Sequence, residues 1–217
     1  MILKPTQPSL AKHLEQYLKY DVKFRKVYKA TKRDFEKINL GAHNFEHIYR
    51  DVCNAIVIGE AEKADMRIVL PAIALHDIGF LYGASGKNHC EVGAAKLPNY
   101  LQKIKVSYPT HVVRHISACI VTHKGSMFEL KPTTLEAKVV CDADLLEKFG
   151  PFGVYQTIRT WVEFGKGIES TIIKLRRDNI PYLSMETKTG NKLITTRARQ
   201  YVKDFANALD RAYEPYR

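Results

Sequence analysis

The sequence predicts an all-α protein that folds as a single domain over residues 1–217. Apolar residues recur at helical spacing along almost the whole chain, and there is no convincing ladder of alternating strand residues. We also find no internal repeat and no low-complexity linker. A length of 217 residues with a hydrophobic content of 45% is enough for one substantial core.

The helices of the N-terminal part can be placed from their polar caps. Residues 9–37 are expected to form one or two amphipathic helices. Asn44 can cap a long helix that runs to about Ala64. Asp65 can cap the next helix, which carries the apolar run 68–78 and tolerates Pro71 because that residue falls early.

The middle of the chain continues the helical pattern after a glycine-containing loop at residues 79–87. Residues 89–104 predict a helix that is bent or broken near Pro98, and residues 109–123 predict one that is opened by proline. Thr133 and Glu136 have the spacing of a capping box for a helix through Phe149.

The pair Gly150-Pro151 is a clear stop signal for that helix. Helices are then expected over residues 152–164, 168–177 and 193–213. Residues 179–192 contain proline, glycine and several threonines, and they are expected to form a loop.

The net charge of +11 favours an anionic partner, which can be a nucleotide, a phosphorylated metabolite or a nucleic acid. The basic residues are spread along the chain, and the densest cluster, residues 174–177, is short. We therefore rank a small phosphorylated ligand above nucleic acid.

The composition also indicates a cytoplasmic protein with no membrane partner. The four cysteines are scattered without a Cys-x-x-Cys pair, which is typical of reduced thiols. No apolar run reaches the length of a membrane span, and residues 1–8 lack the features of a secretory signal. The long terminal helices leave the oligomeric state open.

The pair His76-Asp77, at the end of a strongly apolar run, is the most informative feature of the sequence. With His47 and Asp144 it makes a set of two imidazoles and two carboxylates, offered by three separate helices. Such a mixed set suits Mn²⁺, Fe²⁺, Co²⁺, Ni²⁺ or Zn²⁺. Four protein ligands leave room for water only on an ion that accepts five or six ligands, which favours the first four over tetrahedral Zn²⁺.

Periodicity alone does not decide between Asp142 and Asp144 as the fourth ligand. The two residues lie about 200° apart around a helix, so both cannot face one ion. Asp142 shares its face with Val139 and Leu146, whereas Asp144 shares its face with Val140.

These residues resemble the HD superfamily of metal-dependent phosphohydrolases. The segment 41–50 is similar to the first-histidine helix of that family, His76-Asp77-Ile-Gly to its central motif, and Asp142-Ala-Asp144-Leu-Leu-Glu to its final motif. The resemblance implies an HD-type helical bundle with core motifs at about 40–150 and a C-terminal helical extension over 151–217. It also implies that Asp144 is the ligand.

The C-terminal part resembles a subgroup of small HD proteins that includes bacterial nucleoside triphosphate pyrophosphohydrolases. The similarity rests on Gly150-Pro-Phe-Gly153, Lys174-Leu, the segment 187–190 and Arg197. One departure concerns the arginine that follows the last aspartate in the family. It is often a positive group near the phosphates, and here it is replaced by Leu145.

Further residues receive roles by their place in this pattern. His89 and His123 resemble the ligands of a second metal in two-metal HD enzymes, and with Asp77 and Arg50 they make our catalytic group. Arg50 lies one turn after His47 and is expected to face the same cleft. The candidate substrate-binding residues are His43, Arg50, Lys87, Lys124 and Arg197. His111 and His115 are expected to be surface or packing residues.

The sequence thus predicts an enzyme, a metal-dependent phosphohydrolase that uses metal-activated water on a small phosphorylated substrate, namely a nucleotide. An HD-fold hydratase or lyase acting on a small non-phosphate substrate is one alternative. A nucleic-acid phosphodiesterase, which only the net charge supports, is another. A metal-binding regulatory module without turnover is a third.

Overall fold

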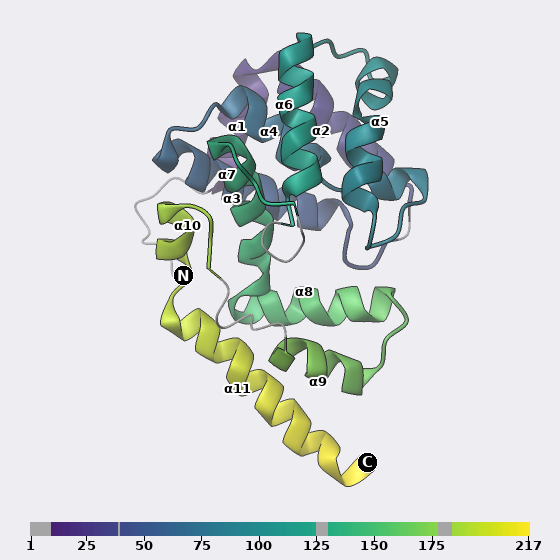
Figure 1. The fold of residues 1–217 in the computed structure, drawn as a ribbon, viewed down its shortest axis with the longest axis vertical. Coiled ribbons are helices and arrows are strands. Elements are labelled where there is room, and N and C mark those ends of the chain that lie inside the picture. Colours follow the sequence, from purple (N-terminus) through teal and green to yellow (C-terminus); the bar gives the residue numbers. More distant parts are fainter. Residues whose placement is uncertain (1–9, 39, 125–129, 178–183) are drawn as a thin grey trace.

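The computed structural model describes residues 10–38, 40–124, 130–177 and 184–217, and the fold over these residues is all-α, as predicted (Figure 1). Residues 1–8, the first residue of the predicted helix 9–37 and part of the predicted loop 179–192 lie outside the described residues. Among the helices that are described, none combines the length and the apolarity needed to cross a membrane.

The elements follow one another as helices joined by short connections. They are α1 (Leu10–Tyr20), α2 (Val22–Phe35), α3 (Phe45–Glu62), α4 (Met66–Leu75), the 3₁₀ helix η1 (Ile78–Tyr82), α5 (His89–Lys103), α6 (Thr110–Thr122), α7 (Leu135–Leu145), η3 (Leu146–Lys148), α8 (Gly150–Glu163), α9 (Ile168–Arg177), α10 (Lys188–Leu193), α11 (Thr196–Tyr213) and η5 (Glu214–Tyr216).

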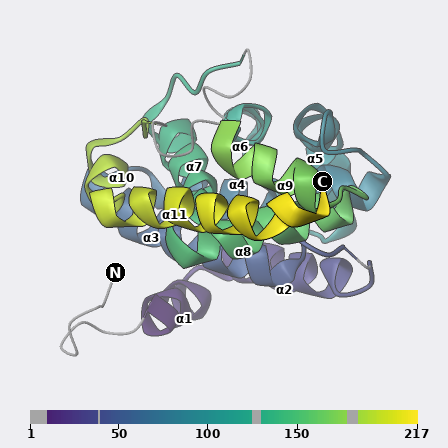
Figure 2. The same cartoon turned by 90° about the horizontal axis from the view of Figure 1, so that it is seen from below.

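The helices form two groups. Helices α1 to α7 pack as a bundle, and α8, α9 and α11 lie against one another below it (Figure 1). Seen from below, α11 crosses the face of α8 and α9 (Figure 2). Each group has its own cluster of buried apolar side chains, and Leu146 packs against both clusters. The single-domain organisation stays a prediction.

Two predicted caps lie where the sequence placed them. The Asn44 side chain accepts a hydrogen bond from the His47 amide at 3.2 Å, and α3 begins at the next residue. The Asp65 side chain accepts a hydrogen bond from the Arg67 amide at 2.9 Å at the start of α4. Each bond satisfies an amide that the first turn of a helix leaves without a partner.

The predicted capping box is shifted by one residue. Thr134, not Thr133, accepts the hydrogen bond from the Ala137 amide at 3.2 Å, and α7 begins at Leu135. The side chain of Glu136 instead accepts a hydrogen bond from the Asp65 amide at 3.0 Å. Glu136 therefore ties α7 to the start of α4, and a tertiary contact replaces the local one.

Helix α5 continues through Pro98 without the predicted break. A proline inside a helix leaves the carbonyl four residues earlier without its usual donor. Here that carbonyl belongs to Ala94, and it accepts a hydrogen bond from the Ser117 hydroxyl of α6 at 3.3 Å. The neighbouring helix thus supplies the missing donor.

Two further differences concern short helices in predicted loops. Residues 78–82 form η1, and Gly79 approaches α5 so closely that a Cβ atom there would lie 2.2 Å from the His89 carbonyl oxygen. Residues 188–193 form α10, whose cap Thr187 is held by a contact with α7 that is described below. Neither helix has the length at which periodicity becomes visible.

Candidate metal centre

The ends of three helices bring the four predicted metal ligands together. His47 lies in the first turn of α3, His76 caps the C-terminus of α4 with Asp77 directly after it, and Asp144 lies near the end of α7. His47 Nε2 is 3.6 Å from Asp77 Oδ2 and 3.5 Å from Asp144 Oδ1. His76 Nε2 is 3.3 Å from Asp77 Oδ2. The role of these residues as ligands stays a prediction.

The donor atoms at this point fit a divalent cation. His76 Nδ1 donates a hydrogen bond to the Ile73 carbonyl oxygen at 2.7 Å, so the lone pair of Nε2 faces the cluster. Neither His76 Nε2 nor Asp77 Oδ2 has a hydrogen-bond partner among the described residues, although both are buried. Buried polar atoms without partners are costly, and a cation between them would satisfy both.

The electrostatics of the pair indicate a site that attracts positive charge. Burial disfavours a charged imidazole, but the carboxylates of Asp77 and Asp144 outweigh it and raise the pKa of His76 to about 9. Burial likewise disfavours the Asp77 carboxylate, but His76 outweighs it and holds the pKa of Asp77 well below its usual range. In the metal-free protein His76 therefore holds a proton next to the Asp77 carboxylate, and a metal ion that binds His76 Nε2 would displace that proton.

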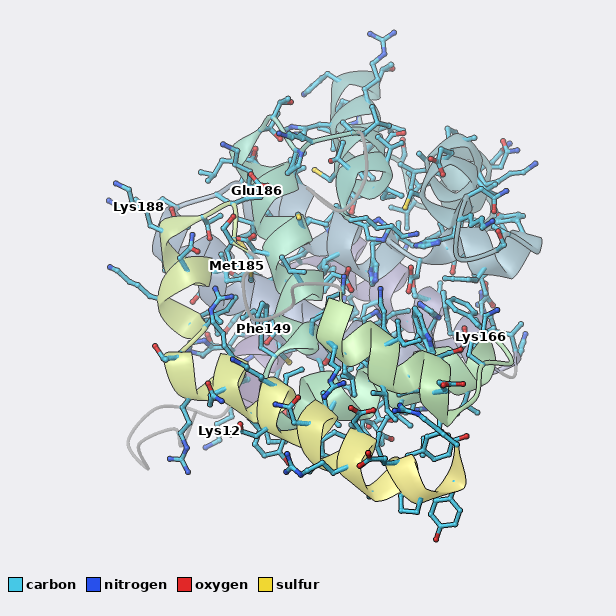
Figure 3. All side chains as sticks on the ribbon, turned by 60° about the horizontal axis from the view of Figure 1, so that its bottom comes forward. Lys12, Phe149, Lys166, Met185, Glu186 and Lys188 are labelled. Carbon is cyan, nitrogen blue, oxygen red and sulfur yellow. The ribbon has the colours of Figure 1, made fainter. Side chains whose placement is uncertain are left out.

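Asp142 points away from this cluster and has a structural role. Its carboxylate accepts hydrogen bonds from the Glu186 amide at 2.7 Å, the Thr187 amide at 2.8 Å and the Thr187 hydroxyl at 2.6 Å. Figure 3 labels Met185 and Glu186 beside α7, directly before α10. Gly190 packs so tightly here that a Cβ atom would lie 2.5 Å from Asp142 Oδ2. Of the two aspartates, Asp144 is the one that faces the cluster.

A second group of donors lies on the other side of Asp77. His89 Nε2 is 3.2 Å from Asp77 Oδ1 and 3.3 Å from His123 Nε2, and the Cys90 thiol is 3.7 Å and 3.9 Å from these two nitrogens. Burial and the neighbouring imidazoles of His76 and His89 lower the pKa of His123 to about 3. The His123 ring is therefore neutral, and its Nε2 has a lone pair that can bind a metal ion. The two oxygens of Asp77 therefore face different clusters.

Glu147 bonds to His47 on the side of the ring that faces away from the cluster. The His47 Nδ1–H group donates a hydrogen bond to Glu147 Oε2 at 2.8 Å, which fixes the tautomer that leaves Nε2 free for a metal. Arg50 donates to both oxygens of Glu147, through Nε and through Nη2 at 2.9 Å. The expectation that Arg50 faces the cleft is wrong, because Glu147 takes its guanidinium, which lines a different cavity beside Phe152.

The cleft above the cluster has a volume of about 240 Å³. Its wall contains residues from α3, α5, α7, η3, α8, α9 and the loops between helices. These residues are His43, His47, Asp77, Gly86, His89, His123, Lys124, Asp144, Glu147, Lys148, Gln156, Thr160, Trp161, Phe164 and Lys174. The helices after residue 150 thus build one side of the site.

Of the predicted substrate-binding residues, His43 and Lys124 line this cleft. The His43 ring lies between those of Phe80 and Phe164, and its Nδ1 is 2.6 Å from Glu163 Oε1. The Lys124 ammonium donates a hydrogen bond to the Gly86 carbonyl oxygen. Lys87 and Arg197 are exposed and do not contribute to the cleft wall.

Lys148 and Lys174 are cleft residues that the sequence reasoning missed. Lys148 directly follows the final motif, and Lys174 belongs to a segment noted for its short basic cluster and for a resemblance, without a role in the site. Burial lowers the pKa of Lys174 to about 8, and the charge of Lys148 adds to this effect. Burial also lowers the pKa of Lys148, against the pull of Asp144. The ammonium groups of Lys148 and Lys174 therefore repel each other electrostatically.

Fold and centre together define an all-α protein with a buried His/Asp cluster that can hold a divalent ion. The HD domain family model matches residues 44–148, a span that begins at the cap of α3 and contains all four predicted ligands. The chain carries an HD domain.

Several solved structures share the fold. Bacillus subtilis YpgQ in complex with ADP is 21% identical, with 87% of this chain and 97% of that chain covered and a TM-score of 0.64. An HD-superfamily hydrolase from Bacillus thuringiensis is 21% identical, with coverages of 88% and 97% and a TM-score of 0.63. A predicted HD superfamily hydrolase from an uncultured Thermotogales bacterium is 22% identical, with coverages of 89% and 92% and a TM-score of 0.58. A comparison with curated proteins found no match.

Proposed function

We propose that this protein is a metal-dependent phosphohydrolase that acts on a small phosphorylated substrate, a nucleotide. The observation that carries the proposal is the presence of three lysines, Lys124, Lys148 and Lys174, in the wall of the cleft that also exposes the His/Asp cluster. Ammonium groups on one side of a divalent-metal site suit a substrate with several phosphate charges.

One of these lysines also lies close to Leu145, the residue that replaces the arginine of the family. Leu145, which stands where the family has an arginine, is 5% exposed and packs in the second apolar cluster with Phe149 and Val154. Lys148 lies three residues later and lines the cleft. In this proposal Lys148 provides positive charge that position 145 cannot.

The cleft can also accept a flat ring. Trp161 and Phe164 line the wall, and the ring of Phe164 stacks with that of His43 at a centroid distance of 5.8 Å and an interplanar angle of 24°. Lys174 Nζ lies 4.8 Å from the centre of the Trp161 ring. Aromatic rings beside cations suit a nucleobase attached to phosphates. Among the fold's relatives, the YpgQ structure is a complex with ADP.

The roles of the residues follow from their places. His47, His76, Asp77 and Asp144 would hold the ion, which when bound supplies Lewis acidity and lowers the pKa of water. Lys124, Lys148 and Lys174 would neutralise the phosphates and the charge that develops on the leaving group. Glu147 keeps the His47 ring in its tautomer, and Arg50 keeps Glu147 in place.

The product of the reaction tests this proposal. Metal-stripped protein is incubated with Mn²⁺ and a pool of ribo- and deoxynucleoside triphosphates, and the mixture is followed by ³¹P NMR. We expect phosphorus signals of product to grow. Pyrophosphate would indicate attack at the α-phosphorus, and orthophosphate would indicate removal of terminal phosphates. An unchanged spectrum, with bound metal confirmed in the same sample, would rule out nucleoside triphosphates as substrates.

The pKa of Lys174 gives a pH dependence for ligand binding. Below about pH 8 Lys174 already carries its proton, whereas above that pH an anionic ligand binds only with uptake of a proton. We therefore expect the affinity for ADP to fall by up to about tenfold per pH unit between pH 8 and pH 9.5. The terminal phosphate of ADP does not titrate in this range, because the second pKa of such a phosphate is about 6. The fluorescence of Trp161, which lines the cleft in a chain with one tryptophan, can report binding.

Two variants separate this effect from other titrations. Lys174→Arg keeps the positive charge at all these pH values, so its affinity should stay level. Lys166→Arg changes an exposed lysine in the turn after α8 and should retain the wild-type fall. A fall of equal size in Lys174→Arg would contradict the assignment.

A further inference from the structure

A further acidic residue, Asp51, lies among the predicted ligands. It follows His47 by one turn on α3 and is 0% exposed. Asp51 Oδ2 is 3.1 Å from His47 Nδ1 and 3.7 Å from His76 Nε2. Neither of its oxygens has a hydrogen-bond partner among the described residues. The sequence alone did not single it out.

Neighbouring side chains donate no hydrogen bond to this carboxylate among the described residues. The single proton on His47 Nδ1 is taken by Glu147 at 2.8 Å, so Asp51 is a second carboxylate beside one N–H group. His76 donates its Nδ1 proton to Ile73, and its Nε2 lies 3.7 Å from Asp51 Oδ2, beyond hydrogen-bond distance. A buried carboxylate whose oxygens find no hydrogen-bond donor is destabilising, and a cation bound to it removes that cost.

The position of Asp51 matches that of the other donors. One donor atom from each of His47, Asp51, His76 and Asp144 lies within 4.8 Å of the others. The 3.7 Å between Asp51 Oδ2 and His76 Nε2 is close to the 3.3 to 3.6 Å that separates the predicted ligand atoms from one another. Asp51 therefore borders the same small volume.

We propose that Asp51 is a fifth protein ligand of this centre, which then has two histidines and three aspartates. On a six-coordinate ion this set leaves one position for water or substrate. Three carboxylates favour Mn²⁺ or Fe²⁺ over tetrahedral Zn²⁺ more strongly than two do. The inference concerns metal binding alone and holds whatever the substrate is.

Counting the waters on bound Mn²⁺ tests the proposal. Protein is loaded with half an equivalent of Mn²⁺, and the line broadening of its EPR spectrum in ¹⁷O-enriched water gives the number of inner-sphere waters. We expect one water in the wild-type protein and two in Asp51→Asn, because water replaces the lost oxygen. The affinity for Mn²⁺ should fall by about tenfold or more.

A matched control is Asp34→Asn, which alters a buried carboxylate of α2 that accepts hydrogen bonds from Lys103 and Tyr100. It should change neither the water count nor the Mn²⁺ affinity. Two or more waters in the wild-type protein would overturn the proposal, and this measurement needs no variant. Weaker binding by Asp51→Asn with an unchanged water count would also overturn it, because Asp51 would then only position the histidines.

Thermal unfolding gives an independent readout. Without metal, Asp51→Asn should raise the melting temperature by about 2 °C or more, because it removes a buried carboxylate that has no hydrogen-bond donor among the described residues. With Mn²⁺ the order should reverse, since the variant gains less from the ion. A metal-free melting temperature below that of the wild-type protein, together with an equal Mn²⁺-induced rise, would speak against a ligand role.

Discussion

Replacement of His76 with alanine is expected to abolish metal binding and hydrolysis. His76 is fully buried, and its Nε2 lone pair faces the cluster without a hydrogen-bond partner among the described residues. Loss of a residue that merely supports a ligand costs about 10- to 100-fold in metal affinity, and loss of a ligand should cost at least as much. Because the proposed chemistry depends on the ion, we expect turnover to fall by about a thousandfold or more.

The measurement is Mn²⁺ binding by titration calorimetry, followed by product formation at saturating substrate. His111→Ala is the control, because His111 is an exposed histidine on α6 away from the cluster, and both quantities should stay at their wild-type values. Circular dichroism checks that the variant folds. Full activity in a folded His76→Ala protein would refute the proposed mechanism.

Replacement of Asp142 with alanine should destabilise the protein and leave the metal centre intact. The substitution deprives the Glu186 amide, the Thr187 amide and the Thr187 hydroxyl of their common acceptor. Hydrogen bonds to a charged group contribute about 1.5–3 kcal/mol each, and buried donors without partners add a further cost. We expect the free energy of unfolding to fall by about 3 kcal/mol or more.

Asp144→Ala, two residues further along α7, should show the opposite pattern. It removes a predicted ligand whose side chain accepts none of these hydrogen bonds, so Mn²⁺ binding should be lost while the stability of the metal-free protein changes little. Urea unfolding and Mn²⁺ titration of both variants decide the matter. If Asp142→Ala lost Mn²⁺ and kept its stability, the two aspartates would have been assigned the wrong way round.

The parts of the fold that could be predicted are those that depend on neighbours in sequence. The caps at Asn44 and Asp65 bond to amides two or three residues away, so residue type and spacing were enough. Thr133 and Thr134 are equally able to cap, and the contact between Glu136 and Asp65 that goes with the second choice is not local. The continuity of α5 depends on Ser117 of another helix.

The same distinction holds for the candidate site. His47, His76 and Asp77 could be selected from a motif, because their pattern follows the sequence. The choice between Asp142 and Asp144 needed the position of Thr187, which is far along the chain. The sequence did not single out Lys148 and Lys174 for the site, since lysine is common in this chain and only the folded structure brings η3 and α9 to the same cleft. Arg50 was expected to face the cleft, but its guanidinium pairs with Glu147, which is far from it in the sequence.

The contact between Asp142 and Thr187 has a consequence for how substrate preference can change. It joins the chain just before the last predicted ligand to the chain that enters α10, so α8 and α9 leave the bundle and return to nearly the same point. These two helices supply Gln156, Thr160, Trp161 and Lys174 to the cleft wall, but none of the four predicted ligands. The residues that α8 and α9 contribute to the cleft wall can therefore be changed, by evolution or by design, while the four predicted ligands keep their places in the bundle.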